Sequence, residues 1–230
     1  MQRLHVLAFG LSAAFGCTGF ESGVAAATHV LTYNVEHPTY GIIGTYTNAI
    51  SENRDVTEVK TDLHVAVKAI GIPVYHQDAT RKERWQHRRL IGFQSSTDDN
   101  GTGISVSGQA EGDRFVIRSS SAGILTAPAQ VHPSNPWSPF LLQNGTIMST
   151  KTGRIHPAVV TDTGEVTMTL DGRPMRVHQW FIDDDKHQIV WIDERGIVVA
   201  FQAQEKGHPI NFVLKSEATE DGTIANLPEP

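Results

Sequence analysis

Cysteine is almost absent from this sequence of 230 residues, in which Cys17 is the only one. It lies within residues 1–27, a segment that has the pattern of a removable leader. Without that leader the chain has no thiol, which excludes a disulfide, a cysteine nucleophile and a thiolate metal site. A chain free of thiols suits an oxidising compartment such as the periplasm.

Excess positive charge and long apolar runs are also missing. The chain has 19 Lys and Arg against 25 Asp and Glu, with a formal net charge of -6. Because phosphate contacts require a basic face, we predict no nucleic-acid partner. No segment approaches the roughly 20 apolar residues that a membrane span requires, so we predict that the mature chain is not transmembrane.

The first 27 residues have the parts of a secretory signal peptide. Arg3 supplies the positive charge, Val6 to Phe15 form a short apolar run, and Val24 to Ala27 end in the small-x-small pattern of a cleavage site. We therefore expect residues 1–27 to be removed and the protein to be periplasmic or secreted. An alternative is a lipoprotein, because the sequence around Cys17 faintly resembles a processing site at which an acylated cysteine would anchor the chain to a membrane.

Short strand-like segments dominate the chain after the leader. They are rich in Val, Ile, Thr and aromatic residues, and many alternate apolar with polar residues. They include Asp62 to Ile70, Gly103 to Gly108, Arg114 to Arg118, Glu165 to Leu170, Arg173 to Ile182, Gln188 to Ile192 and Ile210 to Leu214. Pairs that favour tight turns fall between them, namely Asn100-Gly101, Asn144-Gly145, Asp171-Gly172, Arg195-Gly196 and Lys206-Gly207.

Consecutive strands joined by tight turns run antiparallel. We therefore predict an all-β fold with a single large antiparallel, highly curved sheet of about a dozen strands, an open barrel or a β-spiral. The β domain should span residues 28–216. The acidic, proline-terminated segment 217–230 has few large apolar residues and predicts a flexible tail.

The run Val131 to Trp137, V-H-P-S-N-P-W, interrupts the strand-like sequence and divides the chain into two halves that would meet at residues 128–143. The pattern predicts one short central helix over Pro136 to Gln143, with Asn135 as its N-cap. We expect this helix and its turn to cross or plug one end of the curved sheet.

His132 and Ser134 are the weak candidates for catalysis, since a histidine beside a hydroxyl suggests a nucleophile. No G-x-S-x-G motif surrounds Ser134, and the neighbouring prolines favour a rigid turn in which Ser134 bonds the backbone. We therefore assign no catalytic residue. A hydrolase that uses His132 with Ser134 or a carboxylate such as Asp193 stays an alternative.

Ten histidines follow the leader, but neither the H-x-H nor the H-x-x-x-H spacing of paired metal ligands occurs. His76 with His87, or His178 with His187, could meet across a hairpin, and each pair would lack an obvious third ligand. The acidic runs 97–101 and 183–186 do not match the spacing of a calcium loop. We predict no metal and no cofactor.

Arg81 to Arg89 is the most basic stretch of this acidic chain. Strand alternation places Arg81, Trp85 and Arg89 on one face, with Lys82, Arg84 and Arg88 on the other. The stretch could meet an anionic headgroup or protect a sheet edge from pairing. Together with the central run, it predicts ligand contacts at the concave face of the sheet: Trp85, Arg84, Arg88, Trp137, Phe140 and Leu141.

Several short motifs are spread over the whole mature chain. They are Tyr33 to Pro38 (YNVEHP), Gly41 to Tyr46 (GIIGTY), Glu83 to Trp85, Ala127 to Ala129 before the central run, Met148 to Thr150, and Val190 to Asp193. Together they resemble an uncharacterised family of exported bacterial proteins, known as a domain of unknown function. The resemblance implies a β-rich exported protein and brings no activity. The second half is also similar in outline to periplasmic curved-sheet and open-barrel domains, lipoprotein carriers among them.

We therefore expect a non-enzymatic envelope protein. Its concave face would bind a hydrophobic or lipidic small molecule, or another envelope protein. The alternatives are the hydrolase described above and a purely structural envelope module.

Overall fold

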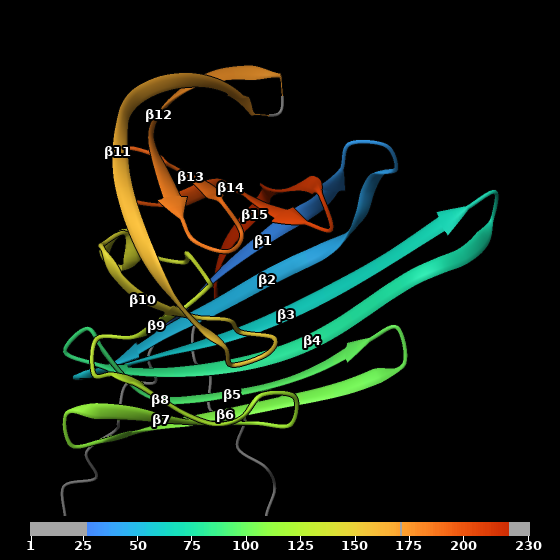
Figure 1. The fold of residues 1–230 in the computed structure, drawn as a ribbon. Coiled ribbons are helices and arrows are strands. Elements are labelled where there is room, and N and C mark those ends of the chain that lie inside the picture. The colour runs from blue at the N-terminus through green and yellow to red at the C-terminus, as the bar shows by residue number, and fades with distance from the viewer. Residues whose placement is uncertain (1–26, 171, 221–230) are drawn as a thin grey trace, which may run out of the picture.

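The computed structural model describes residues 27–170 and 172–220, and these form one sheet of fifteen strands (Figure 1). The strands are β1 (Thr28–His37), β2 (Gly41–Asn53), β3 (Val56–Ala69), β4 (Ile72–Gln86), β5 (Arg89–Asp99), β6 (Thr102–Glu111), β7 (Arg114–Ser119), β8 (Gly123–Pro128), β9 (His132–Pro133), β10 (Gly145–Met148), β11 (Ile155–Leu170), β12 (Arg173–Asp183), β13 (Gln188–Ile192), β14 (Val198–Glu205) and β15 (His208–Glu220).

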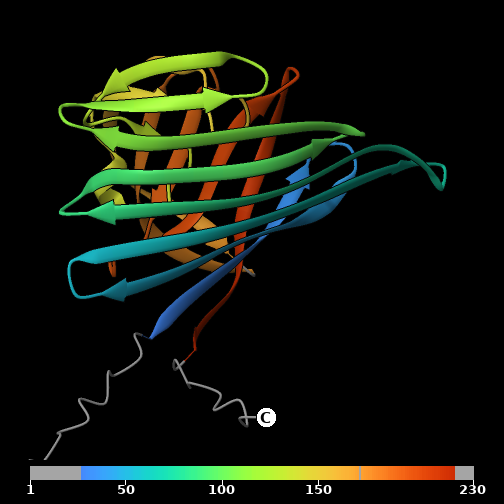
Figure 2. The same cartoon turned by 90° about the horizontal axis from the view of Figure 1, so that it is seen from below.

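The strand order is β8-β7-β6-β5-β4-β3-β2-β1-β15-β14-β13-β12-β11-β10-β9. The first and last strands of the chain therefore pair in the middle of the sheet, and Figure 2 shows β1 to β8 following one another across one side. All strand pairs are antiparallel except β9 with β10, which is parallel. The edge strands β8 and β9 are consecutive in the chain, so residues 129–131 cross the seam of an unclosed barrel.

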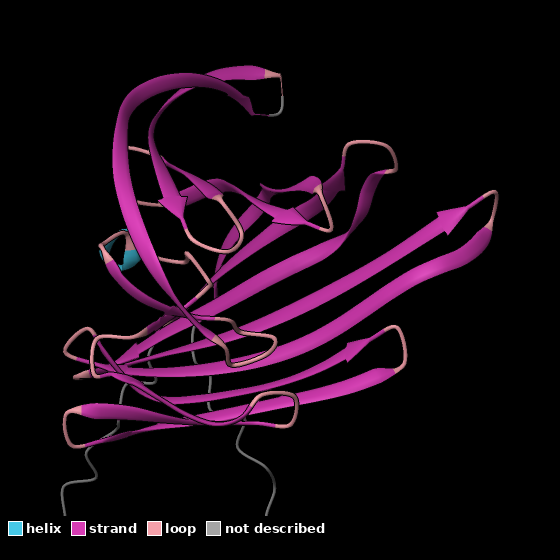
Figure 3. Cartoon of the chain, in the orientation of Figure 1, coloured by secondary structure: helices cyan, strands magenta, loops and turns pink. Residues whose placement is uncertain are grey.

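The predicted all-β, antiparallel, curved-sheet fold is confirmed (Figure 3). Alternation decides which side chains face inward: on β3, Val59, Thr61, Leu63, Val65 and Val67 are buried while the residues between them are exposed. The predicted strands fall inside observed strands, except that Ile70 lies in the turn after β3. Most predictions are too short, because β3 and its neighbours continue through polar residues.

Three of the residue pairs predicted to form turns do connect the two strands of a hairpin. Asn100-Gly101, Arg195-Gly196 and Lys206-Gly207 all lie in turns, and Asn100 and Lys206 have φ values of 55° and 51°. Asn144-Gly145 is different, because Gly145 begins β10 and no hairpin forms there.

The predicted helix over residues 136–143 is wrong in length and type. Only Pro139–Leu141 is helical, as a single 3-10 turn, and Ser138 rather than Asn135 precedes it. Pro139 explains the difference. A proline disfavours helical backbone at the residue before it, and Ser138 is extended with φ -147° and ψ 144°.

The inner face holds two clusters of buried apolar residues. The first, here called the cavity-side core, comes mainly from β1 to β4 and β13 to β15, and includes Tyr33, Tyr46, Leu63 and Phe201. The second, here called the plugged core, comes mainly from β4 to β8 and the central run. Its members are Val59, Trp85, Leu90, Phe93, Val106, Phe115, Ile117, Ala127, Val131, Trp137, Leu141 and Met148.

The predicted limits of the β domain differ from the observed sheet at one end. β15 continues to Glu220, and its residues 217–220 pair with Thr28 to Leu31 of β1. Four residues assigned to the tail therefore belong to the sheet, because pairing with β1 satisfies their backbone groups. The predicted leader, apart from Ala27, and the tail from residue 221 lie outside the described residues.

Candidate ligand-binding cavity

A cavity of about 700 Å³ lies on the inner face beside the cavity-side core. One wall is apolar and comes from β1 to β4, β14 and β15. Its apolar side chains are Val35, Ile43, Tyr46, Leu63, Val65, Val67, Val74, Tyr75, Phe201, Ala203, Ile210 and Phe212. The other wall is polar and consists of Ser149, Thr150, Lys151, Thr152, Arg154, His156, Asp185, Lys186 and Gln188. The cavity is thus amphipathic and has the size of a typical small-molecule site, on the order of 300–1,000 Å³.

Aromatic rings make the apolar wall rigid. Phe201 stacks on Phe212 with a centroid distance of 4.2 Å, and Tyr46 meets both rings edge-on at 5.5 and 5.3 Å. The Tyr33 hydroxyl donates a hydrogen bond of 2.8 Å to the carbonyl of Val198. These contacts fix ring orientations, so the wall is preformed.

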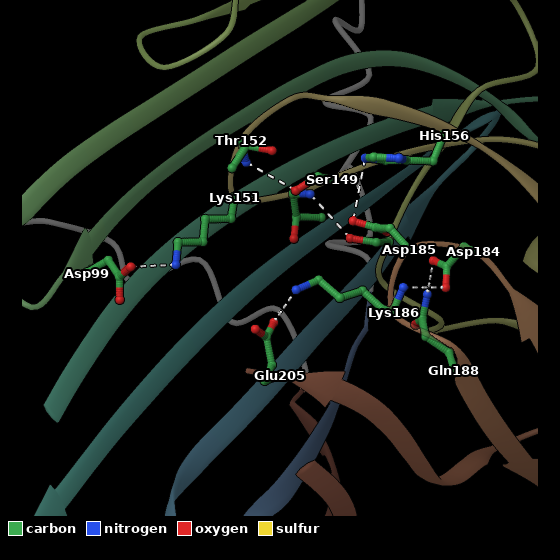
Figure 4. Close-up of polar contacts among 12 residues, drawn as sticks. Asp99, Ser149, Lys151, Thr152, His156, Asp184, Asp185, Lys186, Gln188 and Glu205 are labelled. Carbon is green, nitrogen blue, oxygen red and sulfur yellow. Dashed lines mark hydrogen bonds and ion pairs between the residues drawn. The ribbon is translucent and has the colours of Figure 1, made fainter. Parts of the chain in front are cut away.

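Most charges on the polar wall are already paired (Figure 4). Lys151 contacts Asp99 at 2.6 Å, Lys186 contacts Glu205 at 2.7 Å, and the His156 ring lies 3.5 Å from Asp185. These pairs hold the segment around Lys151 against β5, and Lys186 against the end of β14. Partial burial raises the pKa of Asp99, but the hydrogen bonds from Lys151 and Tyr75 outweigh burial and the pKa is lowered.

Exposed apolar side chains border the cavity on the side of the β1–β2 and β3–β4 hairpins. Tyr40 and Val74 line the cavity and are also about half exposed. The Lys206 ammonium lies 4.4 Å from the centre of the Tyr75 ring. We call the region around Tyr40, Val74, Tyr75 and Lys206 the mouth.

The other side of the cavity abuts a buried polar network centred on Glu83 of β4, which is fully buried. Asn135 donates to one carboxylate oxygen at 3.0 Å, and the indole N–H groups of Trp85 and Trp137 donate to the other at 2.9 Å each. Burial raises the pKa of Glu83, and these three donors partly offset that rise. Burial also raises the pKa of Tyr46 to about 12, and the Tyr46 hydroxyl donates to Asn135 at 2.5 Å.

The structure places the six predicted ligand contacts outside the cavity. Trp85, Trp137 and Leu141 are buried in the plugged core, and Phe140 packs against it. Arg84 and Arg88 are exposed, and the Arg88 guanidinium lies 5.9 Å from the centre of the Phe140 ring. None of the six occurs among the described residues that line the cavity. The central run does plug the sheet, but its Trp137 indole donates to Glu83 and its ring packs in the plugged core.

His132 and Ser134 do not form a catalytic pair in the described structure. His132 is buried, and neither ring nitrogen makes a hydrogen bond of normal geometry to a described residue. Burial lowers its pKa by more than the backbone groups of Pro133 and Gln143 raise it. Ser134 borders the cavity, and its Oγ accepts from the backbone N–H of Thr150 at 3.2 Å. Asp193 accepts from the backbone N–H groups of Arg195 and Ile197, so it stabilises a turn.

Neither of the two histidine pairs considered as metal ligands forms a contact between its members in the described part of the chain. His76 lies 3.4 Å from Asp98, His187 contacts Asp183, and His178 contacts Asp162. Among residues 27–170 and 172–220 no group of three or more His, Cys, Asp or Glu side chains is arranged to hold a metal ion.

Sequence reasoning did not select Glu83, Asn135 as its partner, or Arg81 as a cavity residue. Strand alternation could have indicated two of these residues, because Arg81, Glu83 and Trp85 occupy alternate positions of β4 and all face inward. The contact between Glu83 and Asn135 joins residues 52 positions apart, which no local pattern shows.

Comparisons with known proteins agree with this geometry. The chain is similar over 86% of its length to all of a β-barrel-like protein of the domain of unknown function DUF1849 from Brucella abortus, with 11% identity and a TM-score of 0.63. At that identity the likeness concerns the fold alone. None of the curated proteins matches the sequence. No helix in the described ranges has the length and apolar character needed to cross a membrane. Residues 41–215 match the family model of DUF6134, and the chain therefore belongs to this family, a domain of unknown function.

Proposed function

We propose that the protein is an exported, non-enzymatic binder of a hydrophobic or lipidic small molecule, which it holds in the amphipathic cavity. The observation that carries the proposal is the cavity itself: about 700 Å³ bordered by a preformed aromatic and aliphatic wall. Apolar surface left uncovered inside a fold gains free energy when an apolar ligand displaces water from it. The half-exposed Tyr40 and Val74 give such a ligand an apolar entrance.

The leader pattern in residues 1–27 supports export to the periplasm or beyond. The first strand begins at Thr28, so cleavage after Ala27 would leave every described strand intact. A periplasmic carrier would meet lipids in transit between membranes, which fits a cavity with an apolar wall.

Native mass spectrometry tests this proposal. The protein is purified without detergent from cells that express it naturally, and its mass is compared before and after denaturation. We expect a lipid-sized mass that is lost on denaturation. A bare polypeptide mass would contradict the carrier and favour a structural envelope module.

A pair of variants locates the bound molecule. Val65→Phe adds a ring to the cavity wall and should reduce the fraction of ligand-bound protein. Val159→Phe is the matched control, because Val159 is exposed on β11 and does not border the cavity. Equal occupancy in both variants would show that the ligand binds elsewhere.

A further inference from the structure

Arg81 is the most enclosed cation on the cavity wall. The cavity is bordered by five Lys or Arg side chains and two carboxylates, although the whole chain has a net charge of -6. Lys151 and Lys186 are paired with carboxylates, and Arg154 and Lys206 are exposed. Arg81 is half-buried, and its Nε is buried with no hydrogen-bond partner among the described residues.

The nearest candidate partner of Arg81 is already occupied. Glu83 lies two residues along the same strand face, but its oxygens accept from Asn135, Trp85 and Trp137. Arg81 has no ion pair within 4.0 Å to a described carboxylate. The Arg81 guanidinium lies 5.9 Å from the centre of the Tyr46 ring, which attracts the cation but accepts none of its five N–H donors as a carboxylate or phosphate would.

Polar groups surround Arg81 at this end of the cavity. Ser95 is its register partner on β5, and the Ser95 hydroxyl donates to the Thr150 carbonyl at 2.8 Å. The Thr150 N–H donates in turn to the Ser134 hydroxyl, which leaves the Ser134 proton free to donate into the cavity that it borders. A cation and a hydroxyl donor therefore lie at the end of an otherwise apolar wall.

We propose that Arg81 binds the acidic head of an amphiphile, a carboxylate or a phosphate, whose tail lies along Leu63, Val65 and Val67 towards the mouth. The inference rests on the proposed function and specifies its ligand class. β3 provides a track for the tail: Thr61 is the register partner of Arg81, and Val67 lies about 20 Å further along the strand at the usual rise per residue.

Binding of matched probes tests this assignment. Oleate and oleyl alcohol share a tail and differ in the head, and their affinities are measured by displacement of a fluorescent fatty-acid analogue. We expect oleate to bind more tightly. Arg81→Gln should weaken oleate about tenfold or more, the usual effect of losing a charge-assisted hydrogen bond, and leave oleyl alcohol unchanged. Arg84→Gln is the control, because Arg84 lies on the opposite face of the same strand.

The outcomes separate this inference from the proposed function. Equal affinity for oleate and oleyl alcohol, or oleate binding unaffected by Arg81→Gln, would overturn the role of Arg81 while the cavity still binds lipid. Failure of both probes to bind would count against the carrier itself. Dodecyl phosphate and inorganic phosphate distinguish a lipid head from a free anion, since only the former should bind if the tail contributes.

A second observation concerns the tip of the β3–β4 hairpin and stands independently of Arg81. Ile70 is fully exposed and has a φ of 51°, a backbone conformation that is rare for a β-branched residue. Ile72 and Val74 follow and are also exposed, and Val74 borders the cavity. Lys68 is the one charged residue from 68 to 75, so the tip is apolar with a single positive charge.

We infer that this tip inserts into an anionic lipid bilayer and brings the cavity mouth to the membrane. Exposed apolar side chains on a strained turn are unfavourable in water and favourable in the acyl boundary of a bilayer. The continuity of the tip with the cavity through Val74 favours a lipid surface as the partner.

Flotation with vesicles of equal parts phosphatidylcholine and phosphatidylglycerol tests the insertion. Ile70→Asn should reduce vesicle binding about tenfold, the effect of losing one buried isoleucine. The same substitution should keep or raise the melting temperature, because Asn tolerates positive φ. Ile124→Asn, on an exposed isoleucine of β8, should bind as the parent does. Absence of vesicle binding, or equal binding by Ile70→Asn, would overturn the inference.

Discussion

Val59 and Val65 point to the same face of β3, only six residues apart, and have opposite surroundings. Val59 is fully buried in the plugged core, whereas Val65 borders the cavity. The backbone, the strand and the residue type are the same, so the difference comes from what the rest of the chain places over each position.

The central run makes the difference. Residues 129–131 cross the seam of the sheet, and Trp137 of the central run packs into the plugged core, where its indole donates to Glu83. Leu141 and Met148, from the segment that follows the central run, pack beside it. Val65 instead borders the cavity together with the polar segment around Lys151, which is held against β5 by Asp99. A curved sheet alone thus makes a hollow, and the segment from Val131 to Met148 decides which part of the hollow is filled.

Removing the plug should have the largest effect. Trp137→Ala leaves a void in the plugged core and takes one donor from buried Glu83, so we expect a loss of about 3–5 kcal/mol in the free energy of unfolding, measured with urea. Trp191→Ala is the control. Its indole also donates one hydrogen bond, to Gln179, but Trp191 belongs to neither core, and its loss should be clearly smaller. Similar losses in both variants would show that the central run does not stabilise this half.

The Glu83 network should have the next largest effect. An amide in place of the carboxylate would direct an NH₂ group at a donor, so we expect Glu83→Gln to cost about 1–3 kcal/mol at neutral pH. Glu58→Gln is the control, since Glu58 forms partly exposed ion pairs with Lys60 and Lys82, each worth about 0–1 kcal/mol.

The difference in stability between the parent and Glu83→Gln should also depend on pH. Burial raises the pKa of Glu83 above its ordinary value of 4.5, so the folded state takes up the proton first as the pH falls. The parent should therefore gain stability relative to Glu83→Gln as the pH falls from the raised pKa to 4.5. Urea unfolding at a series of pH values measures this, and a constant difference between the two proteins would contradict it.

The plugged core and the cavity also show which features could be predicted from the sequence. Alternation on β3 and the turn pairs at Asn100 and Lys206 are local, so strands, hairpins and the curved sheet could be predicted. The location of the cavity could not, because it depends on contacts between distant segments. Trp85 and Trp137 were predicted to contact a ligand, since aromatic residues suit both a cavity wall and a core. Only the fold shows that Glu83 turns Trp137 inward.

A larger side chain on β3 should destabilise the protein in the plugged core but not at the cavity. Val59→Phe adds a ring to the filled core and should cost about 1–3 kcal/mol, whereas Val65→Phe can extend into the cavity and should change the free energy of unfolding little. Thermal and urea unfolding of both variants measure the difference. Equal destabilisation by the two substitutions would mean that the cavity has no room for the phenylalanine ring at position 65.

The smallest effect concerns His132, which lies buried beside the plug without a hydrogen-bond partner among the described residues. Burial lowers its pKa below the ordinary 6.5, so the unfolded chain binds the proton first as the pH falls. The parent should therefore lose stability relative to His132→Leu as the pH falls below 6.5, and the difference between the two should be constant well above that value. Melting temperatures from pH 8 to pH 5 test this. The other histidines and Glu83 are common to both proteins and cancel, so parallel curves would mean that His132 is protonated equally well in the folded and unfolded states.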